Sequence, residues 1–349
     1  MVALVDSSGN WVRKLEAFRT PSNARATYEL ALTALLFASS WIATYWGWSS
    51  GRWWLYALAL APTAGFLVRL FLLQHDCGHG SFFASRKAND AVGRSLGVLT
   101  LTPYAHWRRA HAIHHATQGH LGKRGTGDVD TITVAEYRAR GPWARLRYRL
   151  YRHPLVMFGI GPVFVFLVQN RIPAGFMRDG AGPWISTMGT NVVAGVLIAL
   201  AMSTLGVGAF LAVQLPVLVL AATIGVWLFF VQHQFEHTYW EDAPHWNARD
   251  AALAGSSHYD LPRVLRWLTA NIGMHHVHHL SSRVPFYRFR DVADALPELA
   301  SVNRIGFLEG FRCVRLTLWD EDLRRLVSFR DIREPRTGAA SVESNRRSS

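Results

Sequence analysis

Four long apolar stretches constrain this chain more than any other feature. They cover residues 28–48, 53–73, 187–205 and 208–232, and each approaches the roughly 20 residues that a helix needs to cross a bilayer. Only 17% of the residues are charged, against about 25% in soluble domains, and the aromatic content excludes a disordered chain. We therefore predict an all-α integral membrane protein with four transmembrane helices in two hairpins.

Basic side chains gather on one side of these predicted hairpins. Of 37 Lys and Arg residues, 35 lie within residues 1–27, 74–186 and 233–349, while Arg52 lies in a hairpin turn and Arg69 within a span. The positive-inside rule places these three segments, and with them both termini, in the cytoplasm. The net charge of +13 then reflects topology and attraction to anionic lipid, and we expect no nucleic-acid partner.

The same pattern divides the chain into segments. Residues 1–27 are expected to be a cytoplasmic segment without the apolar core of a signal peptide. Residues 28–333 form the membrane domain with a cytoplasmic helical cap, and residues 334–349 form a disordered tail. The apolar stretch 155–169 is short for a span and contains Pro162, so it suits a re-entrant or interfacial element. The preceding residues 143–152 suggest either an interfacial helix or a solvated helix of the cap.

Four histidine clusters lie at the predicted cytoplasmic ends of the spans. Their spacings of three and four residues put the side chains on one face of a helix, and neutral imidazole is a common ligand of iron, zinc and copper. The positions that share such a face, and that we predict as metal ligands, are His75, His79, His111, His114, His115, His237, His275, His278 and His279.

Nine ligands are too many for one ion, because zinc is satisfied by four. We therefore predict a centre with two metal ions. No glutamate is followed three residues later by a histidine, so the paired Glu-x-x-His motif of soluble di-iron proteins is absent. The two cysteines also exclude a four-cysteine zinc or iron–sulfur site.

Other residues in or near these clusters are predicted to have roles other than metal binding. Asp76 and Glu236 lie inside clusters and are predicted to accept hydrogen bonds from ligand imidazoles. Asp128 and Asp130 are further candidates for the same role, but a cap of the turn in the sequence GTGDVD is favoured for both. His276 lies about 100° from His275 on a helical wheel, outside the arc shared by the other histidines of its cluster, and is predicted not to bind metal.

The motifs HDCGH, HAIHH and HHVHH resemble the three histidine boxes of the membrane fatty acid desaturases. The stretches FFVQHQFEHTYW and NIGMHHVHHLSSRVPFYR resemble bacterial acyl-lipid desaturases of the Δ12 (omega-6) group. The resemblance implies two iron ions, O2 as the oxidant, a membrane-lipid acyl chain as substrate and a bacterial inner membrane. It matches His237 to an additional ligand before the last box, and it leaves His233 as a possible ligand of metal or of a metal-bound water.

The sequence contains no HPGG haem motif, so an external electron donor such as ferredoxin with its reductase is expected. Sister di-iron oxygenases, namely fatty acid hydroxylases, acetylenases and carotenoid ketolases, share the same boxes and remain alternatives. A metal transporter or a membrane haem cytochrome would place histidines inside the spans. The four predicted spans contain none, which disfavours both classes.

Overall fold

The computed structural model describes residues 8–332 and is mostly helical. The predicted tail 334–349 lies outside the described residues. The main helices are α2 (Ser8–Leu15), α3 (Asn23–Ser49), α4 (Trp53–His79), α5 (Arg86–Leu99), α6 (Tyr104–Thr117), α7 (Val134–Ala139), α8 (Pro142–Tyr151), α9 (Gly161–Leu167), α10 (Ala181–Leu205), α11 (Val207–His233), α12 (Ala248–Ala254), α13 (Arg263–Leu268), α14 (His275–Leu280), α15 (Phe289–Ala295) and α16 (Pro297–Ser301).

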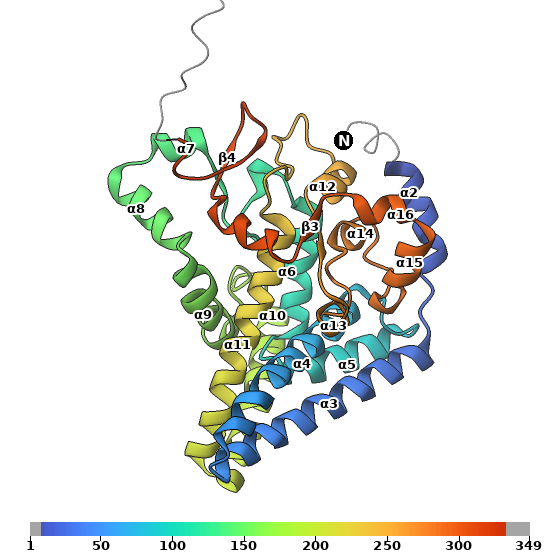
Figure 1. Ribbon diagram of the computed structural model, residues 1–349, viewed down its shortest axis with the longest axis vertical. Coiled ribbons are helices and arrows are strands. Elements are labelled where there is room, and N and C mark those ends of the chain that lie inside the picture. Colours follow the sequence, from blue (N-terminus) through green and yellow to red (C-terminus); the bar gives the residue numbers. More distant parts are fainter. Residues whose placement is uncertain (1–7, 333–349) are drawn as a thin grey trace, which may run out of the picture.

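Four of these helices are long and apolar enough to cross a membrane: α3, α4, α10 and α11. They form two hairpins whose turns lie together at the lower end of the molecule in Figure 1. The fold class predicted from the sequence is therefore confirmed. Both α4 and α11 continue past the predicted apolar stretches to His79 and His233, so each second helix of a hairpin carries histidines out of the apolar region.

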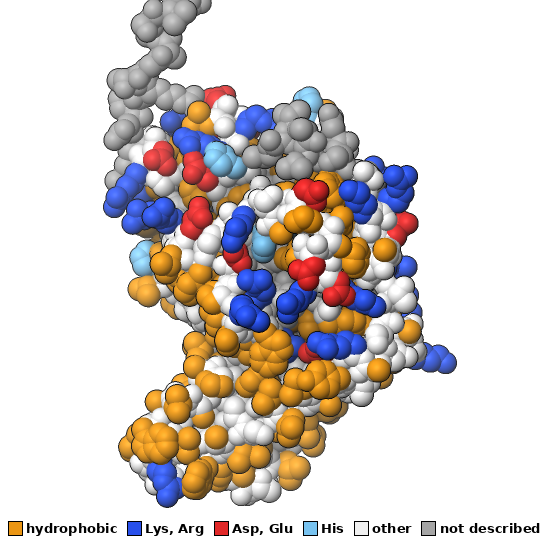
Figure 2. All heavy atoms as spheres, turned by 45° about the vertical axis from the view of Figure 1, so that its right-hand side comes forward, with side chains coloured by type: hydrophobic (Ala, Val, Ile, Leu, Met, Phe, Trp, Pro, Cys, Tyr) orange, Lys and Arg blue, Asp and Glu red, His pale blue; other side chains and the backbone are white. Residues whose placement is uncertain are grey.

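The surface separates into two parts along the same axis. In Figure 2 the lower part is covered mainly by hydrophobic side chains, and charged side chains of both signs lie above it. On α10, Ile185, Val192 and Val196 are each more than 60% exposed. Large aliphatic side chains in such exposed positions are explained by contact with lipid.

The apolar stretch 155–169 does not form a continuous spanning helix. It contains a π-helical segment (Val156–Ile160), α9 and a 3₁₀ turn (Gln169–Arg171), and it is bent by 55° relative to α8. Its end is fixed against α10, because Arg171 donates to the Asn191 Oδ1 atom at 2.7 Å and Asn191 donates back to the Arg171 carbonyl at 2.8 Å. The chain then reaches the start of α10 at the end where α4 terminates, because Gly182 and Pro183 of α10 line one cavity with His79 and Gly80. This path agrees with the predicted re-entrant or interfacial element.

The cap also contains short strands that the sequence patterns did not predict. They are β1 (Ile132–Thr133), β2 (His258–Asp260), β3 (Arg304–Gly306), β4 (Leu318–Asp320) and β5 (Arg325–Val327). Strand β4 pairs in parallel with β1 and antiparallel with β5, and β2 pairs in parallel with β3. Two or three residues are too few for an alternating pattern to be recognised. These strands tie the C-terminal segment to the loops that follow α6 and α12.

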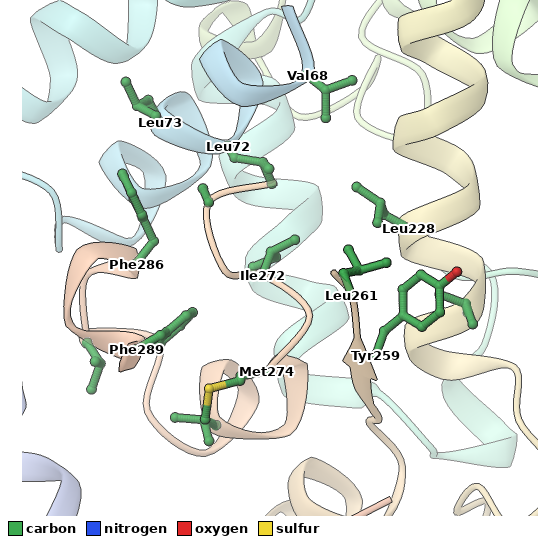
Figure 3. Packing of buried hydrophobic residues seen from close by; sticks show 14 of the residues in the cluster. Val68, Leu72, Leu73, Leu228, Tyr259, Leu261, Ile272, Met274, Phe286 and Phe289 are labelled. Atoms are coloured by element: carbon green, nitrogen blue, oxygen red, sulfur yellow. The ribbon is translucent and has the colours of Figure 1, made fainter. Parts of the chain in front are cut away.

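The hydrophobic core joins the spans to the cap. Figure 3 shows Val68 and Leu72 from α4, Leu228 from α11 and Ile272 from the loop before α14 pointing toward a common interior. All four are buried in one cluster. Because this loop leads directly into α14, packing against the two spans fixes the position of that helix.

A buried ion pair links α3, α4 and α13. Glu29 accepts a hydrogen bond from Arg69 Nη2 at 2.6 Å, and both side chains are at most 3% exposed. Arg69 also donates to Thr33 Oγ1 and to the carbonyl of Trp267, and its guanidinium lies over the Trp267 ring. The exposed Arg25 contacts the other oxygen of Glu29.

We predict that Glu29→Leu strongly destabilises the protein, by about 3–5 kcal/mol, because it leaves the Arg69 guanidinium buried without a counter-charge. Arg25→Leu, which removes the exposed partner of the same carboxylate, should cost about 1 kcal/mol or less. Thermal unfolding of purified variants in detergent measures both. The double variant Glu29→Leu/Arg69→Leu should recover much of the stability lost in Glu29→Leu. Equal destabilisation by Glu29→Leu and Arg25→Leu would contradict this account.

Candidate metal centre

Nine histidines converge in two groups at the end of the spans that faces the cap. Within each group, one ring nitrogen from every histidine lies within 4.8 Å of all the others. Group one consists of His75, His79, His111, His115 and His278, and group two consists of His114, His233, His275 and His279. Eight of the nine predicted ligands are therefore brought together, along with His233.

Helices α6 and α14 each contribute to both groups. From α6, His111 and His115 enter group one and His114 enters group two, whereas from α14, His275 and His279 enter group two and His278 enters group one. Residues four apart differ by about 40° around a helix, and a residue three along points about 60° to the other side. Each HxxHH sequence thus supplies a pair to one group and a single ligand to the other.

The Nε2 atoms of group one face each other at distances that suit a cation between them. His111 Nε2 lies 3.0 Å from the Nε2 atoms of His75 and His79 and 3.1 Å from that of His115, and His278 Nε2 lies 3.0 Å from that of His115. A neutral imidazole has one N–H and one lone pair, so most of these contacts cannot be hydrogen bonds. A shared metal ion removes the repulsion between the lone pairs.

The number of nitrogens also fits a metal site. Group one brings five imidazoles together and group two brings four, whereas a structural zinc ion is held by four ligands. The residues present therefore fit a metal centre, and group one suits an ion with more than four ligands.

Group two shows the same convergence. His275 Nε2 lies 3.0 Å from His233 Nε2 and 3.1 Å from His279 Nε2. The Nε2 atom of His114 is buried and has no hydrogen-bond partner among the described residues, although it belongs to this set. An unpartnered buried acceptor that points at other ring nitrogens is expected when a metal ion satisfies it.

Burial keeps the cap histidines in the form that binds metal. Desolvation, followed by repulsion from neighbouring histidines, lowers the pKa of His111, His115 and His278 well below 6.5. The same two effects lower the pKa of His275 and His279. These imidazoles are therefore neutral at physiological pH, and protons do not compete for their lone pairs.

Three ligand positions are oriented by a hydrogen bond from the opposite ring nitrogen. His114 Nδ1 donates to Asp128 Oδ1 at 2.6 Å, with both side chains at most 7% exposed. His75 Nδ1 lies 3.3 Å from Asp76 Oδ1, and the other oxygen of Asp76 accepts from the Phe286 backbone. His233 Nδ1 lies 3.2 Å from the Gly255 carbonyl. Such contacts fix the tautomer and the ring direction of a ligand.

Asp128 thus has a different position from the one expected, since it contacts a histidine of group two instead of only capping a turn. Gly127 has a φ angle of +72°, and a side chain there would approach the His114 Cβ atom to 3.2 Å. The close approach of this backbone brings the carboxylate of the next residue to His114. The signal in the sequence was the GTGDVD stretch, whose glycines permit such a path.

Two predicted site residues lie away from the groups. Helix α11 ends at His233 because Gln234 leaves the helical conformation (φ −108°, ψ 74°), so His237 does not share a helical face with His233 and is exposed. Glu236 is also exposed and pairs with Arg325. The predictions that His237 is a ligand and that Glu236 supports one are therefore corrected: His233 takes the place in the cluster.

His276 lies where the helical wheel predicted. It is fully buried, its Nε2 atom lies 2.7 Å from the Leu299 carbonyl, and its Nδ1 atom lies 3.5 Å from the Ser257 carbonyl. Burial lowers its pKa to about 4, so the neutral ring donates to Leu299. It belongs to neither histidine group.

Two glutamines that sequence reasoning missed connect the spans to the cap. Gln74, just before His75, accepts from Thr100 Oγ1 at 2.6 Å and donates to the Thr102 carbonyl at 3.1 Å. Gln232, just before His233, donates to the Ile272 carbonyl at 3.0 Å. Both are almost fully buried. Each holds the segment that leads into the next histidine-bearing helix, and the repeated Gln-His pair at the end of a span was the available signal.

An apolar cavity of about 300 Å³ reaches both histidine groups. Its walls come mainly from α4, α6, α9 and α11, and Val68, Leu72, Leu228 and Ile272 of Figure 3 are among them. Three histidines line it: His75 and His111 of group one and His275 of group two. A long apolar group that enters this cavity would therefore lie beside both groups.

These features define a multispan helical membrane protein with a histidine-rich metal site at one end of its spans. The sequence model of the fatty acid desaturase family matches residues 51–308, so the chain belongs to the fatty acid desaturase family and is an oxidoreductase. This result confirms the resemblance noted in the histidine boxes.

Individual relatives agree with the family assignment. The chain is 42% identical to a fatty acid desaturase of Bacillus subtilis over 326 residues, which cover 92% of this chain and 90% of that protein. It is 30% identical to the sn-1 oleoyl-lipid 12-desaturase of Synechocystis sp., and the match covers 66% of this chain and 65% of that protein. It is also 28% identical to the chloroplastic omega-6 fatty acid desaturase of Arabidopsis thaliana, and the match covers 70% of this chain and 54% of that protein.

We predict that Asp128→Asn weakens metal binding at group two by about 10- to 100-fold, because the amide orients His114 less well and does not raise its basicity. Metal analysis after mild chelation should show a selective loss of about one ion per chain. Asp130→Asn is the matched control, since Asp130 is exposed in the same loop. Equal metal retention by both variants would show that Asp128 does not position His114.

A second prediction concerns the last histidine box. His276→Gln should retain its metal, because glutamine can still donate to Leu299 and the ring does not face either group. His275→Ala should lose metal, because it removes a nitrogen that faces both His233 and His279. Metal content per folded chain distinguishes the two. Comparable metal loss in both variants would contradict the assignment of His276.

Proposed function

We propose that this protein is an O2-dependent di-iron desaturase that introduces a cis double bond into a lipid-linked acyl chain, with Δ12 (omega-6) selectivity. The observation that carries the proposal is the apolar cavity that ends beside both histidine groups. Unactivated methylenes along an acyl chain are chemically alike, so their positions relative to the metal centre decide which pair reacts. Relatives named as 12- and omega-6 desaturases support the selectivity.

Iron is the metal that suits this reaction and these ligands. Imidazole binds iron, zinc and copper, but zinc has no redox chemistry, and its structural sites have four ligands, fewer than the five imidazoles of group one. Two iron ions held by groups one and two would supply the O2 chemistry. The overall reaction is R–CH2–CH2–R + O2 + 2e⁻ + 2H⁺ → R–CH=CH–R + 2H2O.

The residues of the chain position the substrate and exclude water from the site. Val68, Leu72 and Leu228 provide apolar walls on two spans, which hold an extended hydrocarbon and exclude water. His75, His111 and His275 present the metal groups to that space. Asp76 and Asp128 keep one histidine of each group in a fixed tautomer.

The two electrons are proposed to come from a separate donor such as ferredoxin with its reductase. The sequence contains no haem motif, and its two cysteines are both buried and cannot form an iron–sulfur cluster by themselves. From the distribution of basic residues, we also propose that the histidine groups and the cap face the cytoplasm of a bacterial inner membrane. The acyl chains of membrane lipids are the proposed substrate.

Expression in a yeast strain that makes oleoyl lipids, together with ferredoxin and its reductase, tests the proposal. Mass spectrometry with double-bond localisation should detect a new cis double bond at the Δ12 position. His233→Ala should abolish this product because it removes a group-two nitrogen, whereas His237→Ala should retain most of it. A hydroxylated or acetylenic product would reject desaturation, and a double bond at another position would reject the Δ12 assignment alone.

A further inference from the structure

A second cavity, of about 890 Å³, shares no lining residue with the apolar cavity. It contains His79 of group one and five arginines: Arg19, Arg86, Arg108, Arg109 and Arg283. Asp90 is its only acidic lining residue. Neither the metal centre nor the acyl cavity requires this concentration of positive charge.

The ends of the spans fix the level of this cavity relative to the membrane. Pro21 lies two residues before α3, Gly80 directly follows α4, and Gly182 and Pro183 belong to the first turn of α10, and all of them line the cavity. The ends of three membrane-spanning helices therefore meet there. This places the cavity at the level of the lipid headgroups.

The existing ion pairs leave two of the arginines available. Arg108 pairs with Asp90 at 2.6 Å and Arg109 pairs with Asp179 at 2.6 Å, while Arg19 donates to Ser281 Oγ at 2.9 Å. Arg86 and Arg283 have no ion-pair partner within residues 8–332, and both side chains are exposed. They come from different elements, the first turn of α5 and the loop after α14, but line the same cavity.

The local backbone adds to this positive field. Helix α5 has 14 residues and begins at Arg86, so the positive end of its dipole lies beside the cavity. Guanidinium groups bind phosphate oxygens in a bidentate manner. The volume lies within the range of pockets that bind small molecules, and it is too small to contain a folded protein.

We propose that this cavity binds the phosphate group of a membrane phospholipid through Arg86 and Arg283. The site goes beyond the proposed function, because binding of a phospholipid here does not depend on desaturation. It rests on the membrane-spanning arrangement of α3, α4 and α10. An anionic phospholipid bound there would fix the protein at a defined depth beside group one.

Native mass spectrometry of the full-length, metal-loaded protein in a non-ionic detergent tests this proposal. The probes are dioleoyl phosphatidylglycerol and a digalactosyl diacylglycerol with the same acyl chains, which lacks phosphate. The phosphatidylglycerol should bind more tightly, and its affinity should fall about fivefold for each of Arg86→Gln and Arg283→Gln. Arg94→Gln is the matched control, because Arg94 is exposed on the same helix but does not line the cavity.

Several outcomes would overturn the proposal. Equal binding of the two lipids, or unchanged binding by the double variant, would remove the phosphate contact. Binding of inorganic phosphate that depends on Arg86 and Arg283, without binding of phosphatidylglycerol, would identify free phosphate as the ligand. Loss of binding to an acidic ferredoxin in the double variant, with lipid binding intact, would assign the arginines to a protein partner. Metal content and melting temperature verify that each variant is folded. If the double variant does not fold, the two single variants test the proposal.

Discussion

The convergence of nine imidazoles, with more close contacts between ring nitrogens than their N–H groups can satisfy, is the constraint on which the rest of the structure depends. Lone pairs about 3.0 Å apart repel each other unless a cation lies between them. The protein holds this arrangement with rigid elements: two membrane helices that end in histidines and two short cap helices between them. Packing of the cap against α4 and α11 resists the repulsion between the lone pairs. A bound metal ion would attract these lone pairs and so remove the repulsion.

The two hairpins contribute in parallel ways. In each, a Gln-His pair lies in the last turns of the second helix, and the glutamine forms hydrogen bonds with the segment that leads to the next histidine-bearing helix. Because α6 and α14 each supply both groups, a displacement of either helix moves ligands of both groups. The two metal sites are therefore coupled by geometry, and damage to one helix affects both.

The spans and most of the cluster could be predicted from the sequence because they follow from hydropathy and helical periodicity. The prediction of His75, His79, His111 and the histidines of the later boxes used only the angle between helical residues that are three or four positions apart. His237 could not be judged in this way, because periodicity does not show that α11 stops at His233. The orienting role of Asp128 depends on the path of a glycine-containing loop, and the exposed position of Glu236 depends on its contact with Arg325 in a distant strand. Such long-range contacts leave no local pattern.

Mössbauer spectroscopy of the protein reconstituted with ⁵⁷Fe(II) tests the central claim most directly, because it reports the ligand environment of each ion without turnover. Groups of five and four histidines predict two distinct quadrupole doublets of equal area, both from high-spin ferrous iron in nitrogen-rich surroundings. One doublet corresponding to a single iron per chain, or a spectrum of adventitious iron only, would contradict a centre with two iron ions built from these two groups.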